Sequence, residues 1–148
     1  MNRALIIASL LVFTSACSDR AKWKPSDFFF SVGDSFTHAY ELKLRDGELY
    51  YYEFQPNPTG DKHIQPVKLQ PTDAQWKDFR RTLDKCAVWQ WQKNYEANIL
   101  DGWGWGLKIQ YGDRQLDSGG FNNSPESFEE VLRAAERLAG GKSFRVDR

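Results

Sequence analysis

The sequence predicts an α+β fold, with a single antiparallel β-sheet of about five to six strands and two α-helices packed on one face. Three observations support this prediction. Apolar and polar residues alternate in several short stretches, turn-forming pairs separate these stretches, and two longer segments repeat apolar residues at helical spacing. Strands joined by short turns run antiparallel, so the predicted order along the chain is βββαβββα.

The length and composition predict one globular domain, because 148 residues with 41% apolar and 27% charged residues are typical of a single core. We assign residues 1–16 to a signal peptide, residues 17–26 to a polar tether, residues 27–141 to the domain and residues 142–148 to a frayed tail. Without residues 1–16 the chain has one more acidic than basic residue. This balance argues against a nucleic-acid partner, which requires a clustered basic surface.

The chain begins with the features of an export signal. Arg3 precedes an apolar run that is too short to span a bilayer as a helix. The following motif, Thr14-Ser15-Ala16-Cys17, resembles the lipobox of bacterial lipoproteins, with Thr14 where leucine is most usual. The resemblance implies that Cys17 becomes the acylated first residue and that Ser18 directs sorting to the outer membrane. An ordinary secretory signal with a cysteine near its end is the alternative.

The lipobox resemblance implies a protein of the bacterial cell envelope that faces the periplasm and has the membrane as a partner through its acyl chains. Each buried methylene of such a chain contributes about 0.8 kcal/mol, so several chains anchor stably. The only other cysteine is Cys86. With Cys17 acylated, Cys86 has no intramolecular disulfide partner, and its helical position predicts a buried thiol.

The first half of the domain reads as strands. Residues 27–32 form a short apolar run, and residues 36–45 and 48–54 alternate on either side of Asp46-Gly47. An Asp-Gly pair between alternating stretches predicts a hairpin, because both central residues of the tight turn need positive φ. Residues 55–70 read as a long loop with a possible edge strand after Pro66.

Two helices follow the strands. Thr72 and Gln75 form a predicted capping box at the start of the first helix, with charged residues including Arg80 on its outer side. For the second helix we predict Ser124 as the N-cap, Pro125 in the first turn and Gly140-Gly141 as the stop. The apolar stripe of the first helix is formed by Trp76, Phe79, Leu83 and Cys86, and that of the second by Phe128, Val131, Leu132, Ala135, Leu138 and Ala139.

Residues 88–111 contain four of the six tryptophans, and we expect their second half, residues 103–111, to be the central strand. We expect residues 88–93 to pair beside it as a further strand, which would bring the tryptophans to one sheet face. An aromatic core layer is one interpretation of the cluster, and a binding platform is the other. The predicted binding residues are Trp91, Asn98, Asp101 and Trp103.

The C-terminal half of the mature chain also resembles a group of small uncharacterised bacterial proteins. The residues that carry this resemblance are Trp89, Trp91, Tyr95, Asp101-Gly102, Trp105, Leu107, Ile109, Gly120, Asn122, Pro125 and Phe128. We attach no activity to that group, so the resemblance transfers no site. It suggests that residues 120–125 form a shaped corner between a strand and the last helix.

No catalytic, metal-binding or cofactor motif is apparent, because the histidines, cysteines and carboxylates lack the spacing that such sites use. The sequence therefore favours a non-catalytic, lipid-anchored envelope protein that binds a protein or glycan. An envelope hydrolase that works through two carboxylates is one alternative. A periplasmic inhibitor or immunity protein is another.

Overall fold

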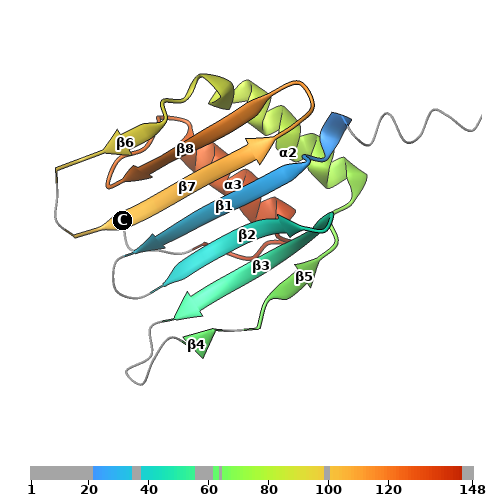
Figure 1. The fold of residues 1–148 in the computed structure, drawn as a ribbon, viewed down its shortest axis with the longest axis horizontal. Helices are drawn as coiled ribbons and strands as arrows, with labels where there is room; N and C mark the ends of the chain where they lie inside the picture. Colours follow the sequence, from blue (N-terminus) through green and yellow to red (C-terminus); the bar gives the residue numbers. More distant parts are fainter. Residues whose placement is uncertain (1–21, 35–37, 56–61, 64, 99–100, 145–148) are drawn as a thin grey trace, which may run out of the picture.

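The computed structural model describes residues 22–34, 38–55, 62–63, 65–98 and 101–144. Within these residues the fold is α+β, as predicted, with one sheet and the two helices α2 (Asp73–Lys85) and α3 (Phe128–Leu138). Both helices lie behind the sheet in Figure 1, and no described helix covers the face toward the viewer. The predicted signal peptide and Cys17 lie outside the described residues.

The strands of the sheet are β1 (Asp27–Asp34), β2 (Ala39–Arg45), β3 (Glu48–Gln55), β4 (Lys62–His63), β5 (Val67–Leu69), β6 (Asn94–Glu96), β7 (Trp103–Gln110) and β8 (Gln115–Phe121). Across the sheet the order is β4-β3-β2-β1-β7-β8-β6, and β5 also pairs with β3. The predicted hairpin is confirmed, since Asp46 and Gly47 join β2 to β3 with φ of 50° and 76°. The predicted edge strand after Pro66 is also confirmed, as β5.

The central strand is β1 rather than the tryptophan-rich β7. β1 pairs antiparallel with β2 on one side and with β7 on the other, and thus joins the β2–β3 hairpin to the β7–β8 hairpin. Its side chains Phe28 and Phe30 are fully buried. The prediction that residues 103–111 form the central strand is therefore wrong by one position in the sheet.

The sheet is mixed, so the prediction of a purely antiparallel sheet is also wrong. β6 pairs in parallel with β8 through residues 94–96 and 119–121. The physical reason is that β8 lies between β6 and β7. β6 and β7 follow each other in the chain and run in opposite directions, and β8 is antiparallel to β7, so β6 and β8 must point the same way.

The first helix begins as predicted. Thr72 is the N-cap of α2, and its side chain and that of Gln75 form both hydrogen bonds of the capping box. The second helix begins later than predicted, at Phe128 with Ser127 as the N-cap. Its predicted first turn is instead closed by a hydrogen bond from the backbone N–H of Phe128 to the carbonyl of Pro125 at 3.0 Å.

The core lies between the sheet and the two helices, and aromatic rings dominate it. Phe28 meets Trp76 of α2 edge to face at 6.1 Å, and Phe30 meets Phe144 at 5.6 Å. Phe144 is 1% exposed, so residues 142–144 are not the frayed tail that we expected. The apolar ring of Phe144 also packs on Tyr40 of β2 at 5.9 Å, and these ring contacts keep the side chain buried. Cys86 is buried, as predicted.

The predicted tether joins the domain where β1 starts and β7 ends. Pro25 is buried, and the backbone N–H of Ser26 donates to the carbonyl of Gln110 at 2.8 Å. The ring centroid of Trp23 lies at similar distances from two ammonium groups, those of Lys22 at 5.2 Å and Lys77 at 5.1 Å. Among the helices that the structure describes, none combines the length and the apolarity needed to cross a membrane.

Candidate functional site

The segment before β6 does not form the strand that we expected for residues 88–93. Val88–Gln90 is a short 3₁₀-helix, η1, which follows α2 directly. It begins after Ala87, whose φ of 49° turns the chain away from the helix axis. Trp89 and Trp91 are consequently placed at the edge of the sheet, where both rings are half-buried.

A cleft of about 500 Å³ opens between this segment and the adjacent ends of β7 and β8. Trp89 and Trp91 contribute its aromatic lining, and Ile109 and Leu116 contribute apolar surface from the sheet. The polar lining consists of Lys93, Lys108, Gln110, Gln115 and Asp117. A lining that combines aromatic and apolar surface with polar groups can both hold and orient a ligand. We call this cavity the tryptophan cleft.

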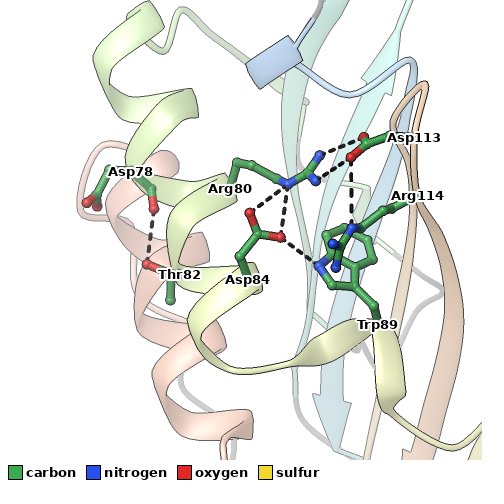
Figure 2. A network of polar contacts seen from close by, with 7 residues as sticks. All are labelled: Asp78, Arg80, Thr82, Asp84, Trp89, Asp113 and Arg114. Atoms are coloured by element: carbon green, nitrogen blue, oxygen red, sulfur yellow. Dashed lines mark hydrogen bonds and ion pairs between the residues drawn. The ribbon is translucent and has the colours of Figure 1, made fainter.

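A buried arginine on α2, Arg80, lies next to Trp89 of the cleft lining, and Figure 2 shows the polar contacts around both residues. The guanidinium of Arg80 donates two hydrogen bonds to the carboxylate of Asp113 in the β7–β8 turn, at 3.2 and 3.0 Å. Its Nε also donates to the carboxylate of Asp84, at 3.2 and 3.1 Å. Arg80 is only 6% exposed, so its predicted place on the outer side of the helix is wrong. Its two carboxylate partners make this burial possible.

The same network holds the ring of Trp89 in place. The indole Nε1 of Trp89 donates to Asp84 at 2.7 Å, and the guanidinium of Arg80 lies 5.0 Å from the ring centroid. Tyr111 meets the ring at 6.0 Å in an edge-to-face arrangement, and Arg114 lies over it at 5.8 Å. Trp89 is therefore oriented before any ligand arrives, which lowers the entropy lost on binding.

The ion pair between Arg80 and Asp113 stays charged near neutral pH. The hydrogen bonds from Arg80 hold the pKa of Asp113 below its usual range. Burial lowers the pKa of Arg80, but Asp113 and Asp84 outweigh that effect and leave it raised. Both groups of the ion pair are therefore charged, and the network acts as a rigid support rather than as a proton donor or acceptor.

Trp91 is fixed from a different side. Its ring meets Trp105 of β7 at 5.6 Å in an edge-to-face arrangement. Trp105 is itself 5% exposed, and its Nε1 donates to the backbone carbonyl of Asn123 at 2.9 Å. Phe128 of α3 packs on Trp105 at 4.8 Å. One side of Trp91 thus rests on the core, while the residue also lines the tryptophan cleft.

Of the four predicted binding residues, the tryptophan cleft includes Trp91. Trp103 is half-buried and packs on Phe128 at 5.4 Å, near the opposite end of β7. Asn98 and Asp101 are exposed in the connection from β6 to β7, and neither they nor Trp103 line the cleft. The structure therefore places Trp91 in the cleft lining and the other three predicted binding residues outside it.

The corner that the sequence suggested does link Asp101 and Trp103. The side-chain amide of Asn122 donates to the carbonyl of Asp101 at 3.0 Å and accepts from the backbone N–H of Trp103 at 2.9 Å. Asn122 has a φ of 52°, which asparagine tolerates better than most residues. Gly120 lies behind this corner, where a Cβ would be 2.4 Å from the carbonyl oxygen of Asn123. The corner is thus a structural feature.

Sequence reasoning missed Trp89 and all of the polar lining as site residues. The signal for Trp89 was available, since it belongs to the same Trp-x-Trp pair as Trp91. The pairing of Lys108 with Asp117 follows from the register of the β7–β8 hairpin, which a two-residue turn at residues 112–113 would have predicted. The position of Lys93 beside them depends on the parallel pairing of β6, for which the sequence holds no local signal.

Two smaller cavities are less suited to binding. One, of about 360 Å³, is a shallow hollow on the open sheet face beside Gly33, Ala39 and Gly104, where burial raises the pKa of Glu41. The other, of about 300 Å³, lies beside Lys24, and its polar residues Glu48 and Lys68 already form an ion pair with each other. Neither is lined by two half-buried tryptophan rings as the tryptophan cleft is.

Cysteine, histidine and carboxylate side chains are the candidates for chemistry among the described residues. No group of three or more His, Cys, Asp and Glu side chains among them is arranged to hold a metal ion. Burial raises the pKa of the Cys86 thiol, which disfavours the reactive thiolate. The lining of the tryptophan cleft contributes one carboxylate, Asp117, whereas glycoside hydrolysis commonly needs two within about 10 Å.

Comparison with known protein families finds no family that matches this chain, and comparison with curated proteins finds no significant match. The resemblance of residues 14–17 to a lipobox and that of the C-terminal half to small bacterial proteins therefore stay predictions.

Proposed function

We propose that this protein is a lipid-anchored protein of the bacterial cell envelope that binds another envelope macromolecule at the tryptophan cleft and catalyses no reaction. In this proposal Cys17 carries the acyl chains and anchors the protein in the outer membrane, facing the periplasm. The observation that carries the binding role is the pair of half-buried rings, Trp89 and Trp91, held rigid at the wall of a cleft of about 500 Å³.

Rigid aromatic rings are well suited to recognition. They provide a large contact area, and a ring that is already oriented loses little freedom when a ligand binds. The polar groups of the lining, among them Lys93, Lys108 and Asp117, can supply hydrogen bonds that give specificity. A hydrolase that depends on two carboxylates has weaker support, because the cleft lining includes only Asp117 as a carboxylate.

Binding is tested with the mature domain lacking its lipid, immobilised and exposed to solubilised envelope fractions. We expect it to retain one or a few envelope components in a defined stoichiometry. Trp91→Ala should weaken that retention at least tenfold, equivalent to a loss of about 1.4 kcal/mol. Trp103→Ala is the matched control, because Trp103 is a half-buried tryptophan outside the cleft lining.

The two variants separate the possible outcomes. Retention that survives Trp91→Ala but is lost with Trp103→Ala would move the binding site to the corner beside Asp101. No retention by the unaltered domain, from any envelope fraction, would contradict a binding function.

The anchor is tested separately through Cys17. Cys17→Ser removes the sulfur that carries the first acyl chain, and without two or more chains stable membrane attachment is lost. We expect the variant to move from the membrane fraction to the soluble periplasmic fraction on cell fractionation. Unchanged partitioning would contradict lipidation and leave the binding role to be judged by the capture experiment.

A further inference from the structure

β6 covers only the last part of the edge of β8. It pairs with residues 119–121, and the backbone N–H of Gly119 donates to the carbonyl of Lys93 at 3.0 Å. The segment before Lys93 leaves the sheet plane, because it is the turn that contains η1. The first part of β8, from Gln115 to Asp117, therefore extends beyond the first residue of β6 and lies beside the tryptophan cleft.

The direction of the backbone groups in this part of β8 follows from the hairpin. The N–H of Tyr111 donates to the carbonyl of Arg114 at 2.7 Å, which makes these two residues a hydrogen-bonded pair. Hydrogen-bonded and non-hydrogen-bonded pairs alternate along an antiparallel ladder, so the pairs that contain Gln115 and Asp117 are not bonded to β7. Their N–H and C=O groups point away from β7, as does the N–H of Gly119.

These groups have no partner within the part of the chain that the structure describes. No hydrogen bond there reaches the outward backbone N–H or C=O of Gln115 or Asp117. Both residues also line the tryptophan cleft, together with Trp89 and Trp91. The cleft therefore has an open strand edge on one side and two oriented rings on the other.

We propose that the tryptophan cleft binds an extended segment of a partner protein, which adds to the sheet as a strand beside Gln115–Asp117, in line with β6. This inference rests on the proposed function, because it names the class of partner that the same cleft takes. An edge that presents N–H and C=O groups in strand spacing is matched by another polypeptide backbone. Three residues of β8 span about 10 Å, so three or four residues of the partner pair with it.

The two sides of the added strand meet different surfaces. Successive side chains of a strand alternate between faces. On the helix-covered face the neighbours are Trp89 and Trp91, whose rings contact Tyr111 and Trp105 of the core side. An apolar side chain of the partner fits there. On the open face the cross-strand pair Lys108 and Asp117 carries one cation and one anion. A polar or charged residue at the next position of the partner fits beside this pair.

The probe for this inference is a displayed library of random linear ten-residue peptides, selected against the domain without its lipid. We expect selection of peptides with an apolar residue followed or preceded by a polar or charged residue. Asp117→Pro removes the outward N–H but no bond to β7, and proline is tolerated at such an edge position. The selected peptides should bind Asp117→Pro at least tenfold more weakly than Asp117→Asn, which also lacks the carboxylate but keeps the outward N–H.

A second measurement leaves the protein unchanged. The selected peptide is resynthesised with one backbone nitrogen methylated at a time, which removes one donor without altering the side chains. We expect alternate methylations to abolish binding, because only every second backbone group of an added strand faces β8. Uniform tolerance of methylation would overturn the added-strand geometry even if Asp117→Pro lost binding through misfolding.

Other occupants of the edge give different results. A glycan as the true ligand would be retained from a panel of envelope oligosaccharides in a Trp91-dependent manner while the library gave no peptide, which overturns the inference and leaves the proposed function intact. A second copy of the chain would give a dimer by analytical ultracentrifugation that Asp117→Pro dissociates, and this also overturns it. Failure of peptides, oligosaccharides and envelope fractions alike would reject both the inference and the proposed function.

Discussion

Two tryptophan pairs with the same spacing, Trp89 with Trp91 and Trp103 with Trp105, occupy different environments in this fold. Trp105 is 5% exposed and stands at the centre of an aromatic cluster, whereas Trp89 and Trp91 are half-buried and line the tryptophan cleft. The first pair lies in and after a 3₁₀-helix, and the second lies in a strand.

The difference shows that residue spacing defines a face only when the backbone conformation is known. In β7 residues two apart point to the same side, so Trp105 joins Leu107 and Ile109 in the core. In a 3₁₀-helix, with three residues per turn, residues two apart point in different directions. Trp89 is accordingly directed to Tyr111 and Arg80, and Trp91 to Trp105.

The largest difference between the two pairs should appear in stability. Trp105→Ala removes a buried ring and leaves a cavity, and we expect it to lower the free energy of unfolding by about 3–5 kcal/mol. Trp91→Ala removes a half-buried ring at the surface and should cost about 1–2 kcal/mol. Urea denaturation of both variants measures the contrast. Equal losses would mean that Trp91 belongs to the core and that the cleft is not a preformed site.

A smaller effect is expected at Gly120, which lets the corner approach Trp105. A Cβ there would lie 2.5 Å from Nε1 of Trp105 and 2.7 Å from the carbonyl oxygen of Tyr95. Gly120→Ala should therefore lower the free energy of unfolding by about 1–3 kcal/mol, the usual effect of overpacking. Gly112→Ala is the matched control, because a Cβ at Gly112 meets nothing within 4 Å. A loss of stability at Gly112 as large as that at Gly120 would contradict the steric explanation.

The fixed orientation of the Trp89 ring should depend on Arg80. Arg80→Ala removes the hydrogen bonds to Asp113 and Asp84 and the cation over the ring of Trp89, and we expect a loss of about 1–2 kcal/mol. The fluorescence anisotropy of Trp89, measured after the other tryptophans are replaced by phenylalanine where the fold permits, should fall. Arg81→Ala is the control, since Arg81 is exposed on the same helix. Unchanged anisotropy in Arg80→Ala would show that the network does not orient the ring.

Local signals predicted the parts of the fold that short segments determine. The capping box of α2 and the turn at Asp46 and Gly47 each depend on residues no more than three apart. The stop of α3 at Gly140 and Gly141 is equally local, and both residues have positive φ. The α+β class followed because these elements leave few ways to bury two helical stripes and one sheet face.

Long-range features escaped prediction because no local pattern encodes them. Arg80 is 33 residues from Asp113, and a helical stripe assigns a charged residue to solvent unless its partners are known. β6 has three residues and pairs with β8 only because β8 lies between it and β7. The tryptophan cleft depends on both of these features, and for that reason only Trp91 of its lining was among the predicted binding residues.

The smallest expected effect is a dependence of stability on pH. It should appear at Asp113, which pairs with Arg80 next to Trp89, and not at Trp105. The pKa of Asp113 is lowered in the folded protein by Arg80, so its charged form stabilises the fold above the unfolded pKa of about 3.9. This contribution is lost as the pH falls through the lower folded pKa. Asp113→Asn should therefore destabilise the protein slightly at neutral pH, and the difference from the unaltered protein should shrink in urea titrations at about pH 3.

Trp105 is held by rings and by the carbonyl of Asn123, so the loss caused by Trp105→Ala should be the same at both pH values. A constant effect of Asp113→Asn across this range would show that the ion pair contributes nothing to holding the wall of the cleft.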